Sequence, residues 1–118
     1  MSHARAFTDP EAGNPRLRGR RYAVPFAEVW RAALAEVESL RGWTLLEARA
    51  QEGEIHAEAR TPVWRFTDDV WIRLSLDTHG LTRVDMVSAS RSGRGDFGAN
   101  ARRIARFLHG LDRRLAHR

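Results

Sequence analysis

The residues with the greatest chemical potential are concentrated in one stretch, Ser88 to Arg103. Gly93 has no side chain, so the backbone there can approach another group closely. Arg91 and Arg94 stand just before a helical pattern that opens at about Asp96, and the N-terminus of a helix attracts anions. We therefore predict an anion site, for a phosphate, a carboxylate or a phospholipid headgroup, with the two arginines as its contacts.

The same stretch also has a purely structural interpretation. Arg91 could pair with Asp68 or Asp69, and Asp96 could cap the final helix by accepting from its free N–H groups. Three polar side chains would then tie the loop to neighbouring backbone: Ser88, Ser90 and Asn100. The candidate binding residues are therefore Arg91, Gly93, Arg94, Asp96 and Asn100, with Ser88, Ser90, Asp68, Asp69 and Arg73 as neighbours.

The adjacent carboxylates Asp68 and Asp69 suggest a second class of function, an enzyme. Neighbouring residues of a strand point to opposite faces, so the two could share a metal only in a loop. No ligand motif accompanies them, and we expect neither a metal nor another cofactor. The enzyme alternative is a small hydrolase or cyclase-like protein with one of these aspartates as general base. A serine hydrolase is disfavoured because the chain has no G-x-S-x-G motif.

Charge suggests a third class, a nucleic-acid-associated protein. The net charge is +5, and every basic residue is arginine. The last helical pattern places Arg102, Arg106 and Arg113 on one face, where they could follow a line of phosphates. That face lies opposite an apolar stripe, however, and no aromatic residues alternate with the arginines as base stacking requires. We therefore keep nucleic acid as a disfavoured alternative.

Apolar periodicity predicts the elements that must position these residues. Helices are expected over residues 25–41 and from 96 or 97 to 116. Strands are expected over residues 43–50, 54–60, 70–76 and 81–90, with a short apolar segment at 63–66 and a short first strand at 20–24. The prediction is an α+β fold: one antiparallel sheet of four to five strands with two helices on one face, in the order (β)αββββα.

The chain is expected to form a single α+β domain over residues 21–118, preceded by a flexible tail over residues 1–20. The tail contains Pro10, Gly13 and Pro15 and shows no apolar period. Residues 1–21 have no apolar h-region, and no segment approaches the roughly 20 apolar residues of a membrane helix. We therefore expect no leader, no transmembrane segment and a cytoplasmic location.

The tryptophans divide into two groups. Trp30 and Trp43 fall on predicted core positions. Trp71 lies on the face of its strand opposite the apolar residues, so we expect it to be exposed. Beside Arg65 and Arg73, it would either mark a binding surface or stack on those arginines.

Several spacings resemble those of a bacterial family catalogued as domain of unknown function 1499. They are Ser88-x-Ser90-Arg91-x-Gly93-x-x-Asp96-x-Gly98-x-Asn100-x-x-Arg103-Ile104, Phe66-x-Asp68-Asp69-Val70 and Val29-Trp30 with Gly42-Trp43. The resemblance covers about residues 22–116. Many members carry a lipoprotein or membrane leader, which residues 1–21 lack. The family has no established activity, so the resemblance implies a relative and no mechanism.

Overall fold

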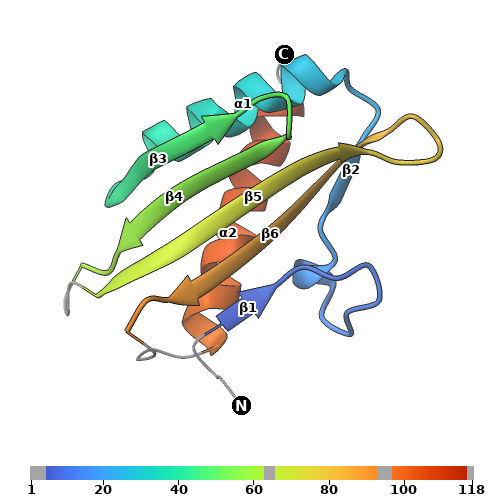
Figure 1. Cartoon of the computed structure of the whole chain (residues 1–118). Helices are drawn as coiled ribbons and strands as arrows, with labels where there is room; N and C mark the ends of the chain where they lie inside the picture. The colour runs from blue at the N-terminus through green and yellow to red at the C-terminus, as the bar shows by residue number, and fades with distance from the viewer. Residues whose placement is uncertain (1–4, 63–65, 93–96, 117–118) are drawn as a thin grey trace.

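The computed structural model describes residues 5–62, 66–92 and 97–116. In chain order the elements are β1 (Arg5–Phe7), the 3-10 helix η1 (Pro15–Leu17), β2 (Arg20–Tyr22), α1 (Phe26–Ser39), β3 (Trp43–Arg49), β4 (Glu54–Arg60), β5 (Thr67–Leu76), β6 (Thr82–Ser90) and α2 (Phe97–Ala116) (Figure 1). The strands form one antiparallel sheet. The predicted α+β class is thus confirmed.

The sheet has the order β1-β6-β5-β4-β3, and β2 pairs with the other half of the β6 edge. It therefore contains six strands, one more than the upper prediction. The additional strand, β1, arises from the segment predicted as a flexible tail. Ala6 is fully buried there and Leu17 is 5% exposed. The tail prediction is wrong for residues 5–19, because a three-residue strand is too short to show a period of two.

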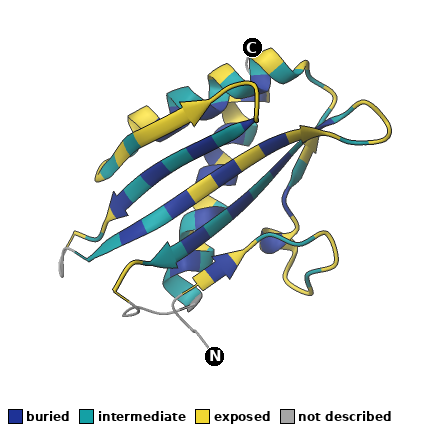
Figure 2. Ribbon diagram, in the orientation of Figure 1, coloured by how far each residue is buried: buried dark blue, intermediate teal, exposed yellow. Residues whose placement is uncertain are grey.

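Alternation along the central strands places one face of the sheet in the core. In β4 the inward residues are Ile55, Ala57 and Ala59, and in β5 they include Val70 and Ile72. Both helices cover this inner face, with α2 packed on β1 and β6 and α1 on β3 and β5 (Figure 1). The opposite face carries no helix, and exposed residues alternate with buried ones along its strands (Figure 2).

Tight turns determine where the edges of the sheet meet the helices. The first helix ends at Ser39, two residues earlier than predicted, and Gly42 adopts a positive φ of 84°. A side chain at Gly42 would also meet the carbonyl oxygen of Arg60, 2.9 Å from the ideal Cβ position. Glycine therefore lets the chain enter β3 directly beside the end of β4.

The length and hydrophobicity of a helix decide whether it can span a membrane. Of the helices in the described residues, none is long and apolar enough to cross a bilayer.

Candidate functional site: an arginine-rimmed groove

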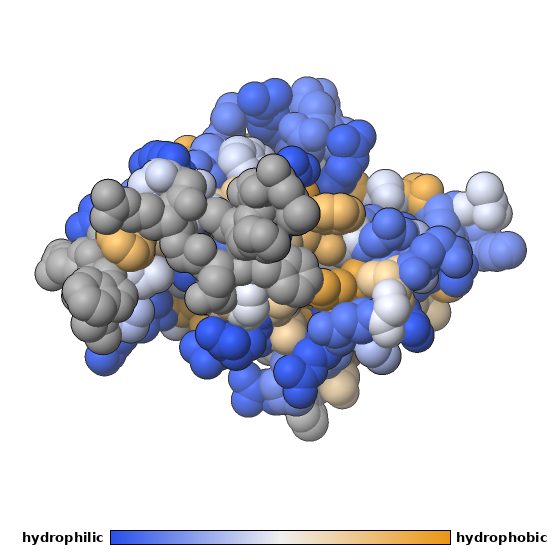
Figure 3. Space-filling model, turned by 90° about the horizontal axis from the view of Figure 1, so that it is seen from below, coloured by the Kyte–Doolittle hydropathy of each residue, from blue (hydrophilic) through white to orange (hydrophobic). Residues whose placement is uncertain are grey.

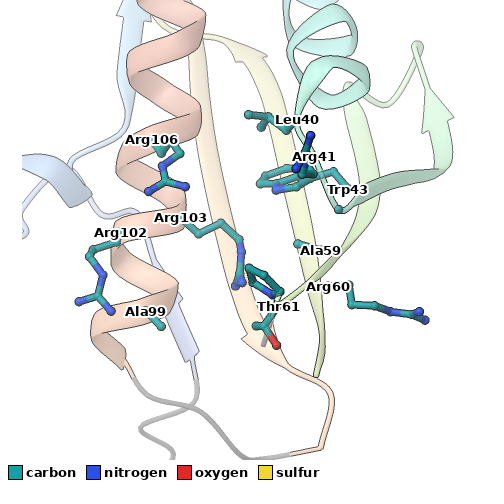
Figure 4. Close-up of a pocket in the computed structure, with 12 residues that line it drawn as sticks. Leu40, Arg41, Trp43, Ala59, Arg60, Thr61, Ala99, Arg102, Arg103 and Arg106 are labelled. Carbon is teal, nitrogen blue, oxygen red and sulfur yellow. The ribbon is translucent and has the colours of Figure 1, made fainter. Parts of the chain in front are cut away.

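A groove of about 660 Å³ lies between the first half of α2 and the end of the sheet where β3 begins and β4 ends (Figure 4). Three segments line it: Leu40, Arg41, Gly42 and Trp43 from the turn after α1; Ala59, Arg60, Thr61 and Pro62 from the end of β4; and Ala99, Arg102, Arg103 and Arg106 from α2. The backbone hydrogen bond from the Arg60 nitrogen to the Gly42 oxygen, 2.9 Å, joins the first two segments.

The floor of the groove is apolar and rigidly supported. The Trp43 ring stacks on the Phe107 ring of α2, with centroids 5.7 Å apart and planes 13° apart. Phe107 and Ala59 are buried, so the floor continues into the core. Seen from the end of the molecule where α2 begins, hydrophobic surface lies among hydrophilic side chains (Figure 3). A ligand in this groove would therefore cover apolar surface.

The rim of the groove is strongly basic. Five arginines line it, and none of the lining residues in the described chain is acidic. Arg41, Arg60, Arg102 and Arg106 make no ion pair within the described residues. Figure 4 shows Arg103 extending from α2 towards Thr61, whereas Arg60 and Arg102 point away on opposite sides. The outer arginines are thus long side chains free to reorient.

Arg103 is held in place by a buried polar network. Its Nη1 donates to Asp68 Oδ2 at 2.5 Å, to Asn100 Oδ1 at 3.0 Å and to Ser88 Oγ at 3.2 Å. The Ser88 hydroxyl in turn donates to Asn100 Oδ1 at 2.7 Å. Asp68, Ser88 and Asn100 are all buried, whereas Arg103 reaches the groove. The network therefore holds the Arg103 guanidinium in the groove wall, and the buried Asp68 carboxylate balances its charge.

Asp69 lies on the opposite face of the sheet, as adjacent strand residues must. Arg91 donates to both oxygens of Asp69, at 2.7 and 3.1 Å, and to Glu58 Oε2 at 3.1 Å. The Arg91 guanidinium lowers the pKa of Asp69, against the opposing effect of burial, and His56 adds to the lowering. Hydrogen bonds to the two carboxylates raise the pKa of Arg91. Two carboxylates thus share one guanidinium, and Arg91 forms the ion pair with Asp69 that the structural interpretation of this stretch predicted.

The predicted site residues therefore separate into distinct places. Gly93, Arg94 and Asp96 lie outside the described residues. Arg73 is in contact with Glu54, 3.5 Å away, and lies four residues beyond Asp69 along β5, so it is not a neighbour of Arg91. Ser90 and Ser92 hydroxyls are 3.3 Å apart. Of the predicted set, Asp68, Ser88 and Asn100 come together, and they support a residue outside that set, Arg103.

Sequence reasoning missed half of the groove. Arg41, Trp43 and Arg60 are about 40 to 60 residues from α2 in the chain, and only the sheet brings them beside it. Gly42-Trp43 was noted as part of the family resemblance, and this pair was the available signal. Arg102 and Arg106 were noted as a possible phosphate track, and they form the α2 rim of the groove.

The described lining of the groove offers no side chain of the usual general acids and bases. No histidine or carboxylate lines it within the described residues. Asp68 and Asp69, the two proposed bases, are both held by arginine. The Arg91 partner favours the ionised form of Asp69 and makes that carboxylate a weaker base. Among the described residues, no three histidine or acidic side chains are grouped as metal ligands.

Comparison with protein families gives a match over nearly the whole chain. The sequence pattern of the family described as "Protein of unknown function (DUF1499)" covers residues 2–111, which includes β1 and nearly all of α2. No curated protein matches the chain.

Proposed function

Because the chain belongs to the DUF1499 family, whose description gives no function, we propose a function from the groove itself. The protein is a binding domain, and it takes an organic anion that has an apolar portion. The observation that carries this proposal is the combination of five arginines and an apolar floor, with no acidic residue among the described residues of the lining. The residues with roles are Arg41, Arg60, Arg102 and Arg106 at the rim and Arg103 in the wall.

Guanidinium groups without an ion-pair partner make the groove attractive to an anion. A salt-bridged guanidinium gains little from a ligand, whereas an unpaired one can donate a fork of N–H groups to a carboxylate or phosphate. Four of the rim arginines have no ion pair within the described residues. Arg103 is already paired with Asp68, so it contributes less to an anion than the rim arginines do, through Nε and Nη2, which make no hydrogen bond within the described residues. Like charges gathered in one groove repel one another, and an anion relieves that repulsion.

The apolar floor restricts the class of anion. Inorganic phosphate would leave the Trp43 edge and its neighbours uncovered, whereas a ligand with a hydrocarbon portion removes that surface from water. Apolar burial contributes roughly 25 cal/mol per Å². The volume of about 660 Å³ is within the range of small-molecule sites. An alkyl phosphate or an alkyl carboxylate has the required combination of a charged head and an apolar tail.

Calorimetric titration of the full chain with octyl phosphate tests the proposal. We expect binding by octyl phosphate, weaker binding by inorganic phosphate and by octanol, and none by octyltrimethylammonium, which has the same tail and the opposite charge. In the double variant Arg102→Gln/Arg106→Gln the affinity for octyl phosphate should fall at least about tenfold, equivalent to about 1.4 kcal/mol.

Arg113→Gln is the matched control. Arg113 is exposed and lies two turns beyond Arg106 on the same face of α2, outside the groove. It removes one positive charge without touching the lining, so its affinity should match the wild type. Equal losses in Arg106→Gln and Arg113→Gln would contradict the proposal, because they would show a general charge effect. Release of inorganic phosphate from octyl phosphate would show that the protein hydrolyses this compound, and the proposal of a binding domain would then be wrong.

A further inference from the structure

Two large aromatic side chains are exposed on the helix-free face of the sheet. Phe7 of β1 is 51% exposed and Trp71 of β5 is 44% exposed. Single exposed apolar residues are normal on protein surfaces. These two, however, belong to one row across the sheet, which sets them apart from scattered surface residues.

The strand register defines that row. Phe7 is opposite Val87 of β6, Val87 is opposite Trp71, and Trp71 is opposite His56 of β4. Directly opposed residues of antiparallel strands point to the same face. The four side chains therefore lie side by side on the outer face, with the small Val87 between two aromatic rings.

Stacking shows which face of the indole is free. The His56 and Trp71 rings are parallel within 4°, with centroids 4.9 Å apart. That distance is one strand spacing, so His56 covers the indole face turned towards β4. The other indole face is turned towards Val87 and Phe7.

The strand spacing sets the distance between the two aromatic side chains. Two strand spacings separate β5 from β1, about 9–10 Å. A flat ring in contact with a wall on each side needs roughly 7–8 Å, twice the optimal carbon–carbon separation. One planar ring therefore fits between Trp71 and Phe7, above Val87.

The polar rim of this slot is balanced in charge. Arg5 and Arg73 supply donors and Glu54 supplies an acceptor around a cleft of about 470 Å³, whereas the Asp85 carboxylate at the same cleft is already paired with Arg83 at 2.8 Å. The Arg5 guanidinium also lies 5.6 Å from the centre of the Phe7 ring. Two positive and two negative groups give no net attraction for an ion. They suit an uncharged ring with both hydrogen-bond donors and acceptors at its edge.

We infer that this slot is a second binding site and that it takes a small molecule with a planar, uncharged heteroaromatic ring of the purine type. Trp71 and Phe7 stack on the two faces of the ring, Val87 forms the floor, and the rim contacts the ring edge. The slot lies on the helix-free face and shares no lining residue with the arginine-rimmed groove within the described residues. The inference is therefore independent of the proposed anion binding.

Adenosine is the probe, and NMR titration of the full chain is the measurement. We expect the Val87 methyl signals to move downfield and the Trp71 indole N–H signal to shift, because a ring held on edge above Val87 places these methyl groups near the ring plane, where the ring current deshields them. Ribose, which has no ring system to stack, should cause neither change. In Phe7→Leu and in Trp71→Leu the affinity for adenosine should fall at least fivefold.

Leu76→Ala is the control, since Leu76 is also exposed on β5 but lies outside the slot; it should bind adenosine as the wild type does. Phe7→Leu leaves the His56–Trp71 stack intact, so it tests the slot even where Trp71→Leu disturbs the fold.

Absence of adenosine binding, or binding unaffected by Phe7→Leu, would overturn the inference. Tighter binding of N-acetyltryptophanamide, or binding of an adenine oligonucleotide without binding of adenosine, would assign the slot to a protein or nucleic-acid partner instead.

Discussion

Asp68 and Asp69 are neighbours in the chain, yet they lie in different surroundings and meet different arginines. Asp68 points to the core and meets Arg103, whereas Asp69 points to the outer face and meets Arg91. The Asp68–Arg103 side chains are 7% and 14% exposed, whereas Arg91 is 50% exposed. A buried ion pair responds strongly to the loss of one partner, and an exposed one responds weakly.

We therefore predict that Asp68→Asn lowers the free energy of unfolding by about 3–5 kcal/mol, the cost of leaving a buried charge without its partner. Urea denaturation at neutral pH measures the change. Asp69→Asn, a change of the same size one residue away, should cost no more than about 1 kcal/mol. Equal losses in the two variants would show that Arg103 does not depend on Asp68 in the folded protein.

The opposite orientations of the two aspartates could be predicted from the sequence, and so could the exposure of Trp71, which is confirmed. The residue on which Trp71 stacks could not be predicted. It is His56, whereas stacking on Arg65 or Arg73 was one of the expectations. The reason is register. Periodicity gives the face on which a residue lies, but the partner on the next strand depends on turn length and on bulges such as the one between Leu45 and Glu47.

The helix α2 packs closely against α1. Gly110 of α2 faces Glu36 of α1, which is buried and accepts a 2.8 Å hydrogen bond from Arg114 Nε. A Cβ at Gly110 would overlap the Glu36 carboxylate. The glycine is thus explained by close packing, because its φ is not positive.

We predict that Gly110→Ala destabilises the protein by about 1–2 kcal/mol, although alanine is better than glycine within a helix by about 1 kcal/mol. In a Glu36→Ala background the overlap disappears, so the same substitution should stabilise by up to about 1 kcal/mol. Thermal or urea unfolding of the four proteins gives this double-mutant cycle. The same sign in both backgrounds would contradict the explanation by packing.

For the helices and strands, the sequence predicted the long elements well and did not reveal the short ones. Five or more apolar positions define α2, and β4, β5 and β6 show alternation, so the bounds of the long elements were predicted to within a few residues. β1 has three residues and a single buried position, Ala6. No period can be recognised in so few residues. The aromatic slot could not be predicted either, because Phe7, one of its walls, belongs to β1.

The whole molecule is a sheet with one face packed by helices and one face open, and β1 completes both sides. On the inner side β1 packs against α2 and buries Ala6. On the outer side it contributes Phe7, one wall of the slot. It also pairs with the half of β6 that β2 leaves free. An unpaired edge of this kind is a template for aggregation.

Removal of residues 1–8 should therefore destabilise the protein, whereas a flexible tail could be removed without effect. The deletion removes the β1–β6 ladder and the three 2.8–2.9 Å hydrogen bonds that join Thr8 to Met86 and Asp85. Each bond contributes about 0.5–1.5 kcal/mol, partly offset by the entropy gained by the freed residues. We expect the free energy of unfolding in urea to fall by at least about 1 kcal/mol, and light scattering to show more self-association.

Removal of residues 1–4 alone is the control and should change neither, because β1 begins at Arg5. Equal stability of the two truncated proteins would mean that β1 contributes nothing to the fold, and the aromatic slot would then lack a fixed second wall.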